Sequence, residues 1–230
     1  MKLSIVIPCF NEANTIEKIL EKIYDYYKES KEIIIIDDYS TDGTREILIK
    51  NIKSFKYNLI LNNKNYGKGF CIKEGVKQAS GEIIVIQDAD LEYDPADYYN
   101  LINPIKKNYA DVVFGSRFQG TQERRVLYFW HSIGNYLLTF LSNMLTNINL
   151  TDMEVGLKAF KSTILKNIKL KENRFGFEPE ITAKISKLNL RIFEVGISYH
   201  GRTYDQGKKI NWKDGVSAIR CILYYNLLNK

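Results

Sequence analysis

Two carboxylates stand close together in the sequence, just after a short apolar run. Asp88 and Asp90 follow the run 82–86 and are separated by one residue. In extended chain, residues two positions apart point to the same side, and carboxylate oxygens are suitable ligands for Mg²⁺ and Mn²⁺. Acidic groups dominate this part of the sequence although the chain carries a formal net charge of +6. A site lined by carboxylates would repel a diphosphate unless a divalent cation lay between them. We therefore expect Asp88 and Asp90 to hold Mg²⁺ or Mn²⁺ beside a diphosphate. Helix capping, the alternative, suits Asp94 before Pro95 better.

Other polar residues that suit a nucleotide follow the neighbouring apolar runs. Asp37 and Asp38 come directly after four isoleucines, and a carboxylate there can accept hydrogen bonds from the edge of a base. Helix capping is the alternative for Asp38 and the expected role of Asp42. Lys68 lies in the segment 65–69, where glycines let the backbone approach a ligand and a helix start favours anions. A tight turn with a solvated Lys68 explains that segment nearly as well.

The first half of the chain predicts the scaffold that positions these residues. Short β-branched runs alternate with amphipathic stretches, which is typical of a parallel sheet with helices on both faces. Strands are expected at 3–7, 32–36, 58–61, 82–86 and 111–114, and helices at 16–23, around Ile47, at 67–79 and at 95–107. Ligands of such α/β sheets bind beyond the carboxyl ends of the strands. Asp38, Asp88 and Arg117 follow the second, fourth and fifth strands, so they are expected at one edge.

The second half of the chain has a different pattern. A helix is expected at 126–145, a loop and strand at 152–160, a helix at 178–188, a strand at 191–198 and a closing helix at 212–228. The first of these helices has more apolar surface than one core contact needs. It is expected to form a homodimer seam or to lie on a membrane surface, with internal packing as the alternative. No linker divides the chain, so we expect a single domain, 1–230, with a nucleotide-binding half at 1–120 and an acceptor-binding half at 121–230.

Composition limits the class of protein. Of the 230 residues, 45% are hydrophobic and 26% are charged, as in an ordinary folded domain. Three cysteines without paired spacing argue against a disulfide framework or a zinc site and favour a reducing compartment. There is no apolar stretch of about 18 residues, and we expect the short apolar run after Met1 to be a first strand and not a signal peptide. We expect a cytoplasmic protein, peripheral on the cytoplasmic membrane face. Its scattered basic residues favour small anions or a lipid surface as partners over nucleic acid.

The motifs, taken in order, resemble those of family 2 glycosyltransferases. They are IVIPCFNE at 5–12, DDYSTDGT at 37–44, NYGKG at 65–69, DAD at 88–90 and GSR at 115–117. Within the family, the chain looks most like the polyprenyl-phosphate sugar synthases typified by dolichyl-phosphate mannose synthase. Segments 151–160, 174–180 and 200–215 extend the resemblance over nearly the whole chain. It implies a GT-A-type nucleotide-sugar-binding fold, a donor such as GDP-mannose or a UDP-hexose, and inversion at the sugar carbon.

The resemblance also implies roles for individual residues. The nucleotide would lie against Pro8, Phe10, Glu12, Asp38, Lys68, Asp88 and Ala89. The metal ligands would be Asp88, Asp90 and Glu92, although the subgroup commonly has Gln at the last position. Asp90 would thereby take part in catalysis, and Arg117 would face the acceptor or donor phosphates.

The chemistry of the acceptor decides which further groups are needed. A sugar hydroxyl needs a general base within hydrogen-bond reach, and Asp152 is the candidate. A lipid phosphate is already an anion near neutral pH and needs cations instead, for which Arg is well suited. Arg117 and Arg202 are the expected phosphate-binding residues. Arg124, Arg125 and Lys209 are further candidates, each with a solvated surface charge as the alternative.

Three functions are compatible with these residues. We favour transfer of a sugar to a polyprenyl phosphate. The alternatives are a family 2 enzyme that extends a cell-surface or soluble glycan, and a non-catalytic nucleotide-binding subunit, against which intact Asp88, Asp90 and Arg117 argue. A nucleotidyltransferase is disfavoured, because the first strand is followed by PCFNE at 8–12 and not by a glycine-rich basic loop.

Overall fold

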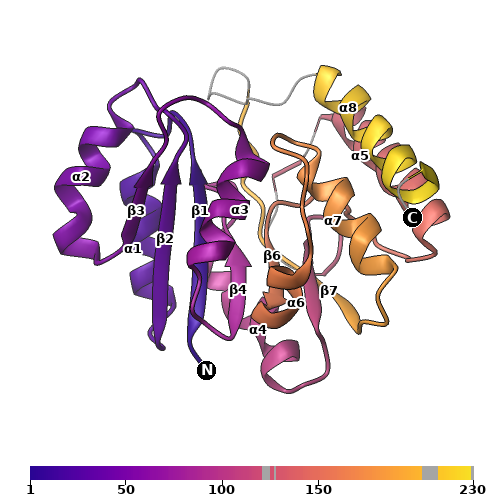
Figure 1. Ribbon diagram of the computed structural model, residues 1–230, viewed down its shortest axis with the longest axis horizontal. Coiled ribbons are helices and arrows are strands. Elements are labelled where there is room, and N and C mark those ends of the chain that lie inside the picture. Colours follow the sequence, from indigo (N-terminus) through magenta and orange to yellow (C-terminus); the bar gives the residue numbers. More distant parts are fainter. Residues whose placement is uncertain (121–124, 127, 204–211, 229–230) are drawn as a thin grey trace.

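One twisted sheet organises the chain. The computed structural model describes residues 1–120, 125–126, 128–203 and 212–228, and within these residues seven strands form a sheet of order β3-β2-β1-β4-β6-β5-β7 (Figure 1). The strands are β1 Leu3–Cys9, β2 Lys31–Asp37, β3 Asn58–Leu61, β4 Ile83–Ile86, β5 Val112–Ser116, β6 Lys158–Lys161 and β7 Ile192–Gly196. β6 is antiparallel to β4 and β5. The other described strand pairs are parallel.

Helices cover both faces of the sheet. They are α1 Ile16–Tyr26, α2 Thr44–Phe55, α3 Lys68–Gln78, α4 Tyr98–Lys106, α5 Phe129–Thr146, α6 Ser162–Asn167, α7 Phe177–Ser186 and α8 Trp212–Leu223. A 3₁₀ turn, Pro95–Asp97, precedes α4, and a π-helical turn, Tyr224–Leu228, follows α8. In Figure 1, α3 and α6 lie in front of the sheet and α1 lies behind it. The ring of Tyr27, at the end of α1, contacts Tyr98 and Tyr99 of α4, so α4 belongs to the layer of α1.

The core forms because the central strands are apolar on both faces. The four isoleucines of β2, Ile33–Ile36, are at most 1% exposed, as expected for a strand covered by helices on both sides. Gly75 lets α3 pack closely on this sheet. A Cβ at that position would lie 2.4 Å from Val6 Cγ1 and 2.8 Å from Ile36 Cδ1. One cluster of buried apolar residues extends from Leu3 to Ile222 and so includes both halves of the chain.

Glu32 ties the amino-terminal edge of the sheet together. Its carboxylate accepts hydrogen bonds from Lys2 Nζ at 2.7 Å and Ser4 Oγ at 2.5 Å, and from the backbone N–H of Ser80 at 2.5 Å. Burial raises the pKa of Glu32, but the hydrogen bonds from Lys2, Ser4 and Ser80 outweigh it and lower the pKa to about 2. The carboxylate therefore joins β1, β2 and the turn before β4 as a charged group.

The α/β class expected from the sequence is confirmed, and each expected strand of the first half overlaps an observed one. Two features were not predicted. β6 is inserted antiparallel between β4 and β5, since strand polarity is not encoded in an apolar run. α6 has six residues, too few for a helical period to be visible. The three cysteines are buried and free. None of the helices in the described part of the chain is long and apolar enough to cross a membrane.

Candidate active site

The polar ends of the parallel strands meet at one edge of the sheet. β1, β2, β4 and β5 run in one direction, and their carboxyl ends lie toward the top of Figure 1. The segments after them carry Glu12, Asp38, Asp88 and Arg117. Side chains from the second half of the chain reach the same edge, as the contacts below show.

Lys68, the first residue of α3, joins an acid from each half of the chain. Its Nζ lies 2.8 Å from Asp88 Oδ1 and 2.9 Å from Glu178 Oε1. Glu178 is buried, and its Oε2 has no hydrogen-bond partner. Burial lowers the pKa of Lys68, but Asp88 and Glu178 outweigh it and raise the pKa well above its usual range. Lys68 is therefore a fixed cation beside the loop after β4, and the alternative of a solvated side chain is wrong.

Arg202 lies among three carboxylates. Its Nη2 is 2.7 Å from Asp90 Oδ2, its Nη1 is 3.1 Å from Glu12 Oε2, and its Nε is 3.5 Å from Glu92 Oε1. The backbone N–H of Arg202 also donates to Glu92 Oε1 at 2.8 Å. Expected as a phosphate ligand, Arg202 is thus placed with acids that the sequence assigned to the nucleotide and the metal.

Negative charge exceeds positive charge around Lys68 and Arg202. Five carboxylates face these two cations, namely Glu12, Asp88, Asp90, Glu92 and Glu178. Burial, with the nearby Asp88 and Glu92, raises the pKa of Asp90 to about 8, although Arg202 opposes the rise. A divalent cation would fit this excess of negative charge, and the oxygen donors suit Mg²⁺ or Mn²⁺.

The three predicted metal ligands do not converge on one point. Among the described residues, no group of three or more His, Cys, Asp or Glu side chains is placed to hold a metal ion. The loop is the reason, because residues 89–92 bend where extended chain was expected. Asp88 consequently faces Lys68, whereas Asp90 and Glu92 face Arg202. Metal binding by Asp88 and Asp90 remains a prediction, and it requires the two cations to release these carboxylates.

Arg117 and Asp152 form a buried pair with two parallel hydrogen bonds. Arg117 Nε lies 2.6 Å from Asp152 Oδ2, and Arg117 Nη2 lies 2.6 Å from Asp152 Oδ1. The exposed fractions of the two side chains are 13% and 0%. Asn135 of α5 accepts from Arg117 Nη2 at 3.0 Å and donates to Asp152 Oδ1 at 3.3 Å. Both oxygens of Asp152, the candidate base, are therefore engaged in holding Arg117.

Tyr199 connects the Arg117–Asp152 pair to the carboxylates around Arg202, and Tyr93 packs against it. The guanidinium carbon of Arg117 lies 5.3 Å from the ring centroid of Tyr199, and the Tyr199 hydroxyl donates to Glu92 Oε2 at 3.0 Å. The ring of Tyr199 contacts that of Tyr93 at 5.5 Å between centroids. Tyr199 therefore contacts both the guanidinium of Arg117 and the carboxylate of Glu92.

Asp38 holds the loop that leads into α3. Its carboxylate accepts hydrogen bonds from Asn62 Nδ2 at 2.8 Å and from the backbone N–H groups of Tyr66 at 2.9 Å and Gly67 at 2.6 Å. Gly67 has a φ of +100°, and a Cβ there would lie 2.5 Å from the carbonyl oxygen of Asn173. The glycine is needed because the segment that contains Asn173 passes this close. The contact of Asp38 with a nucleobase stays a prediction.

Two further ionisable side chains, Lys158 and Glu154, are buried near the site. Lys158 of β6 is fully buried and donates to the carbonyl of Val155, while Glu154 has a buried Oε1 with no hydrogen-bond partner. Burial lowers the pKa of Lys158 to about 8. Burial, together with the neighbouring Glu178, raises the pKa of Glu154 to about 8. The sequence did not reveal this group, because a lysine within a short strand is usually exposed.

The remaining residues named from the sequence are placed as follows. Pro8 and Ala89 are buried, and Phe10 is half-buried after β1. Arg125 Nη1 donates to the carbonyl of Gly201 at 2.9 Å, so it lies near the segment that carries Arg202. Arg124 and Lys209 lie outside the described residues. Sequence reasoning missed Asn135, Tyr199 and Glu178 as site residues; for Glu178 the resemblance of segment 174–180 was the available signal.

Known proteins resemble this chain in sequence. The sequence profile of glycosyl transferase family 2 matches residues 4–169. The chain is 26% identical over 213 residues to the dodecaprenyl-phosphate galacturonate synthase of Rhizobium johnstonii, covering 90% of this chain and 62% of that protein. It is 30% identical over 215 residues to a dolichyl-phosphate beta-glucosyltransferase of Trichomonas vaginalis, covering 86% and 65%. The chain therefore spans less than two thirds of the length of these two relatives.

Another relative has a similar length. The UDP-N-acetylglucosamine–dolichyl-phosphate N-acetylglucosaminyltransferase of Methanococcus voltae is 29% identical over 245 residues, covering 97% of this chain and 94% of that protein.

Solved structures share the fold. The glucosyl-3-phosphoglycerate synthase of Mycobacterium tuberculosis superimposes with a TM-score of 0.77 at 18% identity, covering 98% of this chain and 80% of that one. The same enzyme in complex with Mn²⁺, UDP and phosphoglyceric acid gives a TM-score of 0.73, with 98% and 78% coverage. At this identity the similarity shows the fold alone, and it confirms the expected GT-A-type architecture.

Proposed function

The chain belongs to glycosyl transferase family 2, and from this membership we propose that it transfers a sugar from a nucleotide diphosphate sugar to a polyprenyl phosphate. The three relatives described above carry names that specify a dodecaprenyl or dolichyl phosphate. Their shared acceptor class is a lipid with a terminal phosphate. The proposal extends that class to this chain.

The bidentate pair of Arg117 and Asp152 is the observation that supports a phosphate acceptor. A hydroxyl acceptor would need Asp152 as a free base, but both of its oxygens hold Arg117 at 2.6 Å. A phosphate monoester needs no base, because it is already an anion near neutral pH. It needs an oriented cation, and a guanidinium fixed by Asp152 and Asn135 supplies hydrogen-bond donors in a defined plane.

The carboxylates around Lys68 and Arg202 support the part of the proposal that concerns the nucleotide-sugar donor. Asp88 and Asp90 would hold Mg²⁺ or Mn²⁺, and structural neighbours were solved with Mn²⁺ and UDP or with Mg²⁺ and UDP. The ion, when bound, would neutralise negative charge on the diphosphate leaving group. Lys68 and Arg202 lie beside these carboxylates, so the same cations are available to the donor phosphates. GDP-mannose and UDP-hexoses are the donors we propose.

The reaction we propose is a single displacement. An oxygen of the lipid phosphate forms a bond to the anomeric carbon as the bond from that carbon to the diphosphate breaks on the opposite face, so the sugar carbon is inverted. The electron pair of the breaking bond leaves with the diphosphate. Arg117 orients the attacking phosphate. Residues 1–120 supply most of the donor side, whereas the acceptor side combines Arg117 with Asp152 and Asn135 from residues 121–230.

The experiment that tests the donor half measures nucleotide diphosphate release by purified protein. Each donor of a nucleotide-sugar panel is combined with a short polyprenyl phosphate, with and without Mn²⁺. Asp90→Asn should lower release at least about a hundredfold, because it removes a charge from the proposed ion site. Asp25→Asn is the matched control, since Asp25 is an acid with a 76% exposed side chain. Release at the wild-type rate by Asp90→Asn, or without any divalent ion, would contradict the metal assignment.

A further inference from the structure

Gln87 is a buried polar side chain between the apolar strand β4 and the loop 88–92, which carries the predicted metal ligands. It is 0% exposed. Its side-chain Nε2 donates to the carbonyl oxygen of Asp88 at 3.1 Å and to that of Tyr93 at 3.3 Å. Its Oε1 accepts from the Tyr98 hydroxyl at 2.9 Å. Both donors of the amide group therefore have an acceptor, as buried polar groups usually do.

The two carbonyl groups lie at the two ends of this loop. Asp88 begins the loop, Tyr93 follows it, and Asp90 and Glu92 lie between them. One amide group thus joins the start of the loop to its end, and Tyr98 anchors that amide to α4. An apolar side chain of the same length in place of the amide would leave both carbonyl oxygens without this donor.

A glycine holds the same loop from another segment. The backbone N–H of Gly156 donates to the Tyr93 hydroxyl at 3.0 Å, and a Cβ at Gly156 would lie 2.2 Å from Asp88 Oδ2. The segment before β6 therefore packs directly against the loop. Because the loop is held in this way, an arriving ion must displace the long side chains of Lys68 and Arg202, which now pair with the carboxylates, and not the loop backbone.

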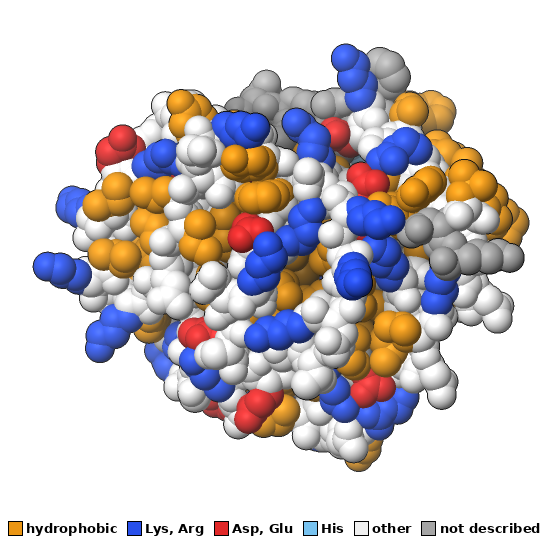
Figure 2. Space-filling view, viewed as in Figure 1, with side chains coloured by type: hydrophobic (Ala, Val, Ile, Leu, Met, Phe, Trp, Pro, Cys, Tyr) orange, Lys and Arg blue, Asp and Glu red, His pale blue; other side chains and the backbone are white. Residues whose placement is uncertain are grey.

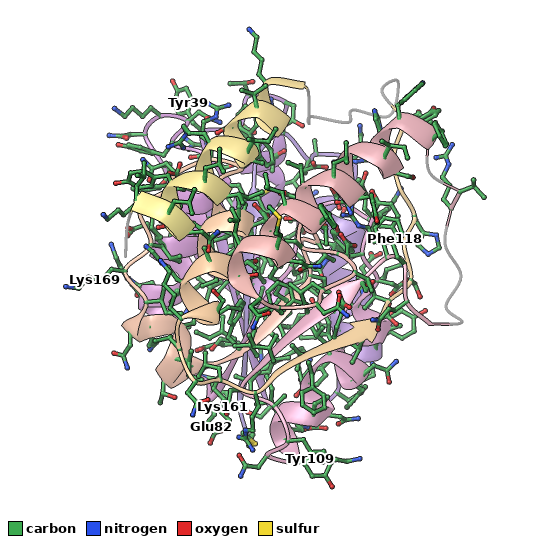
Figure 3. All side chains as sticks on the ribbon, turned by 90° about the vertical axis from the view of Figure 1, so that its right-hand side faces the viewer. Tyr39, Glu82, Tyr109, Phe118, Lys161 and Lys169 are labelled. Atoms are coloured by element: carbon green, nitrogen blue, oxygen red, sulfur yellow. The ribbon has the colours of Figure 1, made fainter. Side chains whose placement is uncertain are left out.

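The charge of the whole molecule does not attract a cation. In Figure 3, Glu82, just before β4, lies near the bottom and Tyr39, just after β2, lies near the top, so β4 carries the loop to the upper edge of the sheet. Figure 2 shows Lys and Arg side chains gathered over the middle of one face, with acidic side chains scattered among them, and the net charge is +6. A divalent cation therefore depends on how a few carboxylates are arranged.

We propose that Gln87 is a positioning residue of the ion site, whose amide group fixes the ends of the loop so that Asp88 and Asp90 can bind one Mg²⁺ or Mn²⁺ together. This inference rests on the proposed function, because it takes Asp88 and Asp90 to be the ligands. Gln87 acts through the loop backbone. Loss of a group that orients metal ligands through hydrogen bonds costs about 10–100-fold in metal affinity.

Titration of the full chain with Mn²⁺ alone tests the proposal, with free Mn²⁺ measured by electron paramagnetic resonance. Gln87→Met keeps the length of the side chain and removes its hydrogen bonds, and Tyr98→Phe removes only the hydroxyl that orients the amide. We expect the Kd for Mn²⁺ to rise at least about tenfold in Gln87→Met and about twofold to fivefold in Tyr98→Phe. Ile84→Val is the control and should keep the wild-type Kd. Ile84 is a buried residue of β4, and its truncation lowers stability without removing a hydrogen bond from the loop.

The outcomes separate this inference from the proposed function. A Kd for Gln87→Met within about twofold of wild type would overturn the role of Gln87. An equal rise in Ile84→Val would overturn it too, because affinity would then follow stability and not the loop contacts. If Gln87→Met does not fold, Tyr98→Phe decides, and wild-type affinity in that variant would overturn the inference. Failure of the metal assignment itself is distinct, since Asp90→Asn would then bind Mn²⁺ as tightly as wild type.

Discussion

Replacing Asp152 by Asn tests how Arg117 is held. The substitution keeps the size of the side chain and one acceptor oxygen, but it removes the negative charge and one of the two hydrogen bonds at 2.6 Å. The guanidinium remains in place with a side chain that is only 13% exposed. Its Asn135 contact and the ring of Tyr199 remain, but neither carries a negative charge.

The expected cost follows from the burial of the pair. Removing one partner of a buried ion pair costs about 3–5 kcal/mol, because the other charge is left uncompensated. Since Asn retains one acceptor, we expect Asp152→Asn to lower the free energy of unfolding by about 2–4 kcal/mol. Asp111→Asn is the matched control. Asp111 pairs with both Arg191 and Lys161, each at 2.8 Å, but the side chains of these cations are 47% and 27% exposed. Water can solvate them once Asp111 is neutral, so this substitution should cost less than Asp152→Asn.

Two measurements check this prediction. Urea unfolding with an unchanged m-value gives the stability difference. Transfer kinetics should show a KM for the lipid phosphate at least about tenfold higher, with kcat at saturating acceptor within about threefold, because Asp152 positions Arg117 and takes no proton. The reasoning is refuted if Asp152→Asn is as stable as Asp111→Asn. A collapse of kcat with a hydroxyl acceptor, at unchanged KM, would instead identify Asp152 as a base.

Other predictions concern single contacts of the donor side and the sheet. Glu178→Gln should raise the KM for the nucleotide sugar about threefold to tenfold, because Lys68 loses one charge-assisted partner, and an unchanged KM would remove Glu178 from the site. Glu32→Gln should lower the free energy of unfolding at pH 7 by about 1–2 kcal/mol. Because the folded-state pKa of Glu32 is lowered to about 2 from 4.5, its contribution is present above pH 4.5 and is lost as the pH falls toward 2. A constant difference across urea titrations from pH 7 to pH 2.5 would contradict this. Gly67→Ala should cost about 2 kcal/mol, because its φ is +100° and its Cβ would meet Asn173 at 2.5 Å, and wild-type thermal stability would refute the close approach.

The scaffold could be predicted from the sequence because its signals are local. Four consecutive isoleucines followed by two aspartates already place Asp38 at the end of a buried strand, and Asp88 is placed in the same way after 82–86. The carboxyl ends of parallel strands share an edge. The polar residues of the first half were therefore expected together, and the structure brings them there.

The pairing of charges could not be predicted, because it depends on contacts between distant segments. Asp152 is 35 residues from Arg117, and Glu178 joins Lys68 from the other half of the chain. Neither segment contains a sequence pattern that identifies the residue with which it pairs. The bend after Asp88 has the same origin, because it places Asp90 against Arg202, a contact across 112 residues. Sequence reasoning therefore named Lys68, Arg117 and Arg202 and every acid of the site except Glu178, but it did not show which cation pairs with which acid.

The most direct test of the central claim compares two acceptors that differ only in the phosphate. Purified protein with Mn²⁺ and its preferred nucleotide sugar is given a short polyprenyl phosphate or the corresponding polyprenol, and nucleotide diphosphate release and sugar transfer are measured together. We expect transfer to the phosphate at a rate at least about a hundredfold above that to the alcohol, because the site has an oriented Arg117 and no free base at Asp152. Transfer to the polyprenol or to a sugar hydroxyl at a rate equal to or above that to the phosphate would contradict it.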